Sequence, residues 1–78
     1  MWYEDIIEIN GIEVQYRCQC SNKNIEEGID GGKIQKLAGK IKDKPCGLLF
    51  HYYNGRWDMK PRTELAKNAY EYIVKKYN

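Results

Sequence analysis

The chain has 78 residues, of which 42% are apolar and 31% are charged, and its formal net charge is +2 at pH 7. This length predicts one domain near the lower limit for a core that needs neither metal nor disulfides, and the composition excludes a disordered or fibrous chain. No apolar run reaches the length of a membrane span, and the acidic start MWYEDII lacks the apolar core of a signal peptide, so we expect a cytoplasmic protein without membrane partners.

The small net charge conceals an uneven distribution along the chain. Residues 1–30 carry seven acidic and two basic side chains, whereas residues 31–78 carry four acidic and eleven basic ones. The second part is therefore a candidate surface for anionic partners, unless the two parts neutralise each other within the fold or across a dimer.

The first predicted element is a β-hairpin centred on Asn10-Gly11. This dipeptide separates two β-rich runs, and a type I′ turn needs positive φ at both central positions, which Asn and Gly tolerate best. The register that follows pairs Ile9 with Ile12, Ile7 with Val14, Asp5 with Tyr16, Tyr3 with Cys18, Glu4 with Arg17, and Glu8 with Glu13. Cys18 and Cys20 then fall on the apolar face of the hairpin.

A polar loop over residues 21–32 and a third strand over residues 33–41 follow. Alternation places Gln35, Leu37, Gly39 and Ile41 on one side of this strand and Ile34, Lys36, Ala38 and Lys40 on the other. The glycine-rich loop is either a plain turn or a backbone cradle for phosphate. The candidate ligands in the second case are Gly31, Gly32, Lys33 and Lys36.

Asn54-Gly55 predicts a second hairpin after the turn at residues 42–47. Its register pairs Tyr53 with Arg56, Tyr52 with Trp57, His51 with Asp58, and Phe50 with Met59. One face then carries Leu48, Phe50, Tyr52, Trp57 and Met59, and the other carries Leu49, His51, Tyr53, Arg56, Asp58 and Lys60. The first set is apolar and the second mostly polar, which supports this register.

A helix closes the predicted fold. Pro61 cannot continue a central strand, and Thr63 is a good helix N-cap. An apolar stripe with spacings of three and four follows, formed by Leu65, Ala66, Ala69, Tyr70, Ile73 and Tyr77. We therefore expect a single α+β domain over residues 1–78, with an antiparallel sheet of four to five strands and the C-terminal helix across the Phe50 and Trp57 face.

Two segments carry a resemblance to a known family. They are Gly-Ile-Asp-Gly-Gly-Lys-Ile-Gln-Lys-Leu at residues 28–37, and Tyr-Asn-Gly-Arg-Trp-Asp at residues 53–58, before the closing helix. Over about the last fifty residues the chain resembles a family of small domains of unknown function from Gram-positive bacteria and their phages, with GINGGRISKL-like and YDRGWD-like segments. Asn-Gly-Arg stands here where that family usually has Asp-Arg-Gly, and the three cysteines are not part of its pattern. The resemblance implies a short accessory protein, often on a mobile element, that acts by binding rather than by catalysis.

The residues that could carry chemistry are few. His51 opposite Asp58 has the form of an oriented imidazole, but no nucleophile is placed beside it, so a cross-strand ion pair is favoured. Cys18, Cys20, Cys46 and His51 are potential zinc ligands, although their spacing lacks close Cys-x-x-Cys pairs. We expect free thiols, no metal or cofactor, and no enzymatic activity.

The outer face of the second hairpin is the remaining candidate site. Tyr53, Arg56 and Lys60 share it, near Arg62. Aromatic and basic side chains together can bind a nucleotide or a protein partner, or they can simply form a solvent-exposed sheet face. We expect a homodimeric binding protein that sequesters a nucleotide-like anionic signal through this face or a dimer seam. The alternatives are a module that inhibits a host defence protein, and a nucleic-acid-binding protein.

Overall fold

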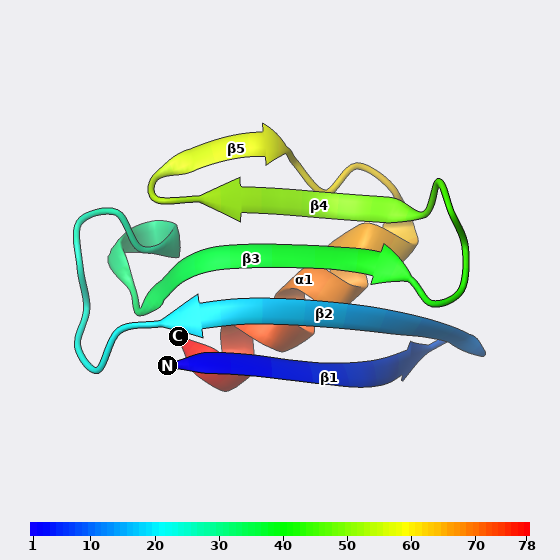
Figure 1. Ribbon diagram of the computed structural model, residues 1–78, viewed down its shortest axis with the longest axis horizontal. Coiled ribbons are helices and arrows are strands. Elements are labelled where there is room, and N and C mark those ends of the chain that lie inside the picture. The colour runs from blue at the N-terminus through cyan, green and yellow to red at the C-terminus, as the bar shows by residue number, and fades with distance from the viewer.

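A computed structural model describes all 78 residues and shows five strands and one α-helix. The elements are β1 (Trp2–Ile9), β2 (Ile12–Cys20), the 3-10 turn η1 (Ile29–Gly31), β3 (Ile34–Ile41), β4 (Leu48–Tyr53), β5 (Arg56–Met59) and α1 (Glu64–Tyr77). The strands form one antiparallel sheet in chain order, and α1 crosses one face of it diagonally (Figure 1). The predicted α+β fold, an open sheet with a C-terminal helix, is confirmed.

Both Asn-Gly turns form as predicted. Asn10 and Gly11 have φ values of 51° and 82°, and Asn54 and Gly55 have values of 45° and 90°. These left-handed conformations are the ones that a two-residue hairpin turn requires. The β1–β2 register matches the prediction at every pair, from Ile9 opposite Ile12 to Tyr3 opposite Cys18.

The core lies between the sheet and α1. Thr63 caps the helix, since its Oγ1 accepts a hydrogen bond from the backbone N–H of Ala66 at 3.1 Å. The helix buries Ala66, Ala69 and Ile73 against the sheet. On the same side Tyr70 makes edge-on ring contacts, with centroid distances of 6.1 Å to Phe50 and 5.5 Å to Trp57. The predicted docking face is therefore confirmed.

The far end of α1 is joined to the sheet by polar groups. The hydroxyls of Tyr16 and Tyr77 lie 2.8 Å apart, and burial together with this hydrogen bond raises the pKa of Tyr16 above its usual value. At 14 residues, α1 has neither the length nor the apolar character of a helix that crosses a membrane.

Three irregularities in the strand registers correct parts of the prediction. The β2–β3 register shifts between Gln19 and Cys20, so that Cys20 lies opposite Ile34. Ile34 is therefore fully buried, whereas the predicted alternation placed Gln35 on the core side instead. A β-bulge changes which residues point to a given face, because one strand contributes an extra residue there.

The other two shifts affect β4. One lies beside Gly39 and Lys40 in the β3–β4 ladder; Leu49 is buried and Leu48 is 48% exposed, the reverse of the prediction. The other lies between His51 and Tyr52 in the β4–β5 ladder. Tyr53 opposite Arg56 and Tyr52 opposite Trp57 are confirmed, but Met59 lies opposite His51 and not opposite Phe50.

Candidate functional site

The sheet face that α1 leaves uncovered contains a depression centred on Ala38. Ala38 lies opposite Arg17 of β2 and His51 of β4 in the strand registers. Its methyl group is short and its neighbours are long, so the surface is lowest at Ala38. We call this depression the Ala38 groove. It consists of two adjoining hollows.

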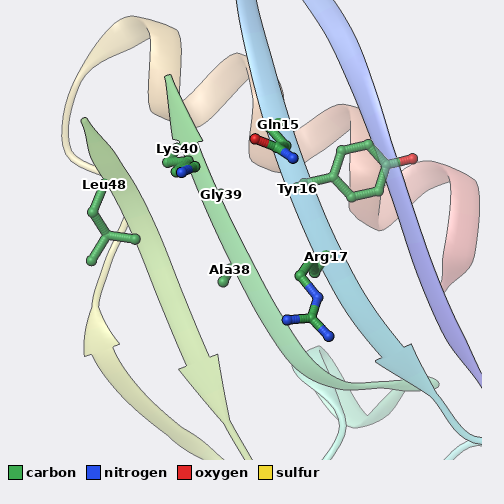
Figure 2. A pocket seen from close by; sticks show the side chains of 7 residues that line it. All are labelled: Gln15, Tyr16, Arg17, Ala38, Gly39, Lys40 and Leu48. Atoms are coloured by element: carbon green, nitrogen blue, oxygen red, sulfur yellow. The ribbon is translucent and has the colours of Figure 1, made fainter. Parts of the chain in front are cut away.

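Two adjoining hollows make up the groove. The first has a volume of about 220 Å³ and is shown in Figure 2. Its lining residues are Gln15, Tyr16, Arg17, Ala38, Gly39, Lys40 and Leu48. The second has a volume of about 360 Å³, and its lining residues are Trp2, Arg17, Lys36, Leu37, Ala38, His51, Tyr52 and Tyr53. The hollows share Arg17 and Ala38, so they are continuous, and neither lining includes an acidic residue.

Cationic and aromatic groups meet in the larger hollow. The guanidinium carbon of Arg17 lies 5.0 Å from the ring centroid of Trp2. The Nζ of Lys36 lies 4.7 Å from the ring centroid of Tyr53 and 5.8 Å from that of Trp2. Trp2 and Tyr53 are half-exposed, at 50% and 49%. Ring faces and cations that remain open to solvent are groups that stack on planar ligands and attract anions.

The cations of the groove are only partly neutralised. Arg17 forms an ion pair with Glu4, with 3.2 Å between Nε and Oε2, but both side chains are about 60% exposed. Such a pair is screened by solvent and is easily exchanged for another anion. The acidic side chains that contact a basic one are Glu4 with Arg17, Glu13 with Lys42, and Asp58 with His51. Lys36 and Lys40 therefore have no acidic group within ion-pair distance.

His51 and Asp58 interact at one edge of the groove. Nδ1 of His51 lies 2.7 Å from Oδ2 of Asp58, so the predicted contact exists although the backbone register is shifted. The groove lining contains no serine, threonine or cysteine beside His51. Because the Asp58 carboxylate contacts Nδ1, it orients the His51 imidazole and leaves Nε2 as the remaining polar atom of the ring.

The predicted ligand residues separate into three groups. Tyr53 and Lys36 lie in the groove, and Arg56 lies opposite Tyr53 in the strand register, next to the groove at the β5 edge. Lys60 and Arg62 follow β5 in the connection to α1, and neither lines a hollow.

The third group comprises Gly31, Gly32 and Lys33 of the glycine-rich loop, whose amides are already paired. The N–H groups of Gly31 and Gly32 donate to the carbonyls of Gly28 and Ile29, at 2.9 Å each. The N–H of Lys33 donates to Oδ1 of Asn78 at 2.8 Å. A phosphate cradle needs free N–H groups, and those of Gly31, Gly32 and Lys33 are not free.

Sequence reasoning missed most of the groove lining as ligand residues, and Trp2 and Arg17 are among those missed. They became part of a site only once β1 and β2 were placed beside β3. A signal was present in the sequence, because the predicted pairing of Glu4 with Arg17 put Arg17 on the face opposite the apolar one. Combining that face with the predicted Lys36 and Ala38 face of the third strand would have located the groove.

The thiols lie away from the groove. Cys18 and Cys20 are buried on the helix side, whereas Cys46 is exposed in the β3–β4 connection. Burial, and to a smaller extent the neighbouring Cys20, raises the pKa of the Cys18 thiol to about 12. No group of three or more His, Cys, Asp or Glu side chains could hold a metal ion, so the zinc alternative has no ligand set here.

Together, these features define a small α+β domain with one sheet face covered by a helix and one open face that is aromatic and basic. The chain belongs to a family described as a domain of unknown function (DUF7678), whose model matches residues 1–78. No curated protein matches the chain, and neither does any solved structure. The expectation of a small domain of unknown function is thus confirmed, and the family model covers the whole chain.

Proposed function

We propose that this protein is a non-enzymatic binding protein whose Ala38 groove holds an anionic, nucleotide-like ligand. The observation that carries the proposal is the position of Lys36, whose ammonium lies beside the rings of both Tyr53 and Trp2. A base needs an aromatic surface and a phosphate needs a cation, and this arrangement supplies both within one hollow. The absence of acidic residues from the lining supports the same ligand class.

The context of the proposal is a short cytoplasmic protein of a phage or mobile element that sequesters a nucleotide-like signal. The segments at residues 28–37 and 53–58 support this context, because they resemble domains from Gram-positive bacteria and their phages. Sequestration needs affinity and no catalytic group, and Arg17, Lys36 and Lys40 supply cations that could provide this affinity.

The second candidate is a module that binds and inhibits a host defence protein. The observation that favours it is the exposed apolar surface on the same face, where Trp2, Leu48 and Tyr53 are each about half-exposed. Tryptophan, tyrosine and arginine are enriched in the centres of protein interfaces. The two candidates use the same residues and differ in what the face binds.

A thermal-shift screen distinguishes them. Purified protein is heated with a panel of nucleoside mono-, di- and triphosphates, and a ligand of the folded state should raise the melting temperature by several degrees. Lys36→Ala should abolish the shift, whereas Lys67→Ala, the same change at an exposed position on α1, should leave it intact. A shift retained by Lys36→Ala would remove the groove from the proposal. No shift with any nucleotide would favour the protein partner.

A homodimer is part of the proposal. β1 is an edge strand, and its exposed large apolar side chains include Trp2, Tyr3 and Ile6. An edge strand presents unpaired backbone groups that a second copy can complete. Sedimentation at micromolar concentration should give twice the mass of the chain, and a monomer mass throughout would overturn the dimer.

A further inference from the structure

We infer that the Ala38 groove binds two nucleotide units joined through phosphate rather than a single nucleotide. This inference rests on the proposed function and narrows its ligand class. It depends on three features of the groove: two separate ring surfaces, a cation between them, and the adjoining smaller hollow with its own cation.

The two ring surfaces come from different strands. Trp2 lies on β1 and Tyr53 on β4, with β2 and β3 between them. Neighbouring strands are spaced by about 4.8 Å, so the two rings are rooted three spacings apart and converge over the groove. Each is half-exposed, so each has surface on which one base can stack.

One cation serves both rings. The ammonium of Lys36 lies within 5.8 Å of both ring centroids, so it is positioned between the two stacking surfaces. A phosphate that links two stacked bases would lie in the same place. When bases stack on the two rings, the long side chain of Lys36 can move off the ring faces while its ammonium stays at the phosphate. Lys36 then exchanges two cation–π contacts for an ion pair.

The smaller hollow, described first above, extends this arrangement along β3. Lys40 lies there without an acidic partner, and Leu48 adds an exposed apolar surface (Figure 2). Arg17 lines both hollows and is held only by the exposed pair with Glu4. The groove thus carries Lys36, Arg17 and Lys40 in succession, which matches a ligand with more than one phosphate better than a ligand with one.

Tryptophan fluorescence tests the inference directly. Trp57 packs against Tyr52 and Tyr70 on the helix side, so a Trp57→Phe variant leaves Trp2 as the only tryptophan, located in the groove. This variant is titrated with adenosine monophosphate, a linear adenine dinucleotide with a 5′-phosphate, a cyclic adenine dinucleotide and a short single-stranded oligoadenylate. If Trp57→Phe does not fold, the difference in quenching between the native chain and Trp2→Phe reports on the same residue.

We expect quenching by base stacking, with a two-base ligand at least tenfold tighter than the monophosphate. Tyr53→Ala should reduce the affinity for the two-base ligand to that of the monophosphate, because it removes one stacking surface. Tyr72→Ala, the same change at an exposed position on α1, should have no effect. Tighter binding of the cyclic ligand would identify a signalling molecule, and tighter binding of the linear ligands would identify a nucleic-acid strand; both support the inference.

Any of three results would overturn it. Equal affinity for one- and two-base ligands would show that the groove holds a single nucleotide, which overturns the inference and leaves the proposed function standing. An unchanged affinity of Tyr53→Ala for the two-base ligand would show that only one ring takes part. Failure of every ligand to quench Trp2 would overturn both the inference and the proposed function.

Discussion

The two faces of the sheet use small residues in opposite ways. Gly39 and Ala38 are neighbours on β3, but they point to different faces. On the covered face, a Cβ at Gly39 would lie only 2.4 Å from the ring of Phe50, so the glycine makes room for a buried side chain. On the open face, no ring fills the space above Ala38, and a groove remains. Missing side-chain volume therefore makes room for a buried ring on one face and leaves the proposed binding groove on the other.

The largest expected effect on stability comes from removing a buried side chain from the covered face. Phe50→Ala should reduce the free energy of unfolding by about 3–5 kcal/mol, because Phe50 is fully buried against Gly39 and Tyr70. Urea denaturation measures the loss, and Phe50→Leu gives a smaller, measurable change if the alanine variant is unfolded. Tyr53→Ala on the open face is the control; an equal loss there would contradict the distinction between the faces.

A smaller effect is expected from adding volume next to the same ring. Gly39→Ala should cost about 1–3 kcal/mol of unfolding free energy, since the new methyl group overlaps Phe50. Ala38→Val adds volume at the adjacent residue, where the groove has space, and should leave stability nearly unchanged while weakening ligand binding. Denaturation and ligand titration of both variants check the pair. If Ala38→Val is the more destabilised variant, the assignment of the two faces is wrong.

The covered face should also make stability depend on pH, because the thiols of Cys18 and Cys20 are buried there and can ionise. Burial raises the pKa of Cys18 to about 12, against 9.0 for a free thiol. The unfolded chain therefore releases this proton at lower pH than the folded chain. The contribution of the protonated Cys18 thiol to the free energy of unfolding should be fully present below pH 9 and be lost between pH 9 and 12.

The measurement is the urea midpoint at several pH values in this window. Tyrosines also titrate here, so the comparison that matters is with Cys18→Ala, whose stability should decline less steeply. An identical decline in both proteins would show that Cys18 does not contribute to the pH dependence.

The smallest effect on stability is expected on the open face itself. Glu4→Gln removes the exposed partner of Arg17 and should change the free energy of unfolding by less than about 0.5 kcal/mol. It also frees Arg17, so the affinity for an anionic ligand should rise. Denaturation and titration at low salt measure the two effects. A marked loss of stability, or unchanged affinity, would contradict the role of Arg17 in the groove.

The sequence predicted the arrangement of strands better than the orientation of individual side chains. The β1–β2 register was predictable because a two-residue turn sets it and no bulge interrupts the ladder. The positions of Ile34, Leu48 and Leu49 were not, because bulges depend on how a strand fits its partner.

The same distinction applies to the candidate site. Tyr53 was predicted from the alternation within its own hairpin, whereas Lys36 was predicted as a partner of the glycine-rich loop and lies in the groove instead. The groove as a whole could not be derived in this way, since Trp2 and Arg17 join it only through the order of strands in the sheet. Nor could the engagement of the Lys33 amide, which donates to Asn78, a residue distant in the chain.

The strand order also bears on how quickly the protein folds. Each strand pairs with its neighbour in the chain, so the sheet can be assembled from short loops at little cost in chain entropy. The hydrogen bond between Tyr16 and Tyr77 instead spans 61 residues, and we expect it to form after the rate-limiting step. Tyr77→Phe should then accelerate unfolding in stopped-flow experiments and leave the refolding rate unchanged. We therefore expect the Ala38 groove to form early in folding, and the helix docking on the opposite face, which slows unfolding, to come late.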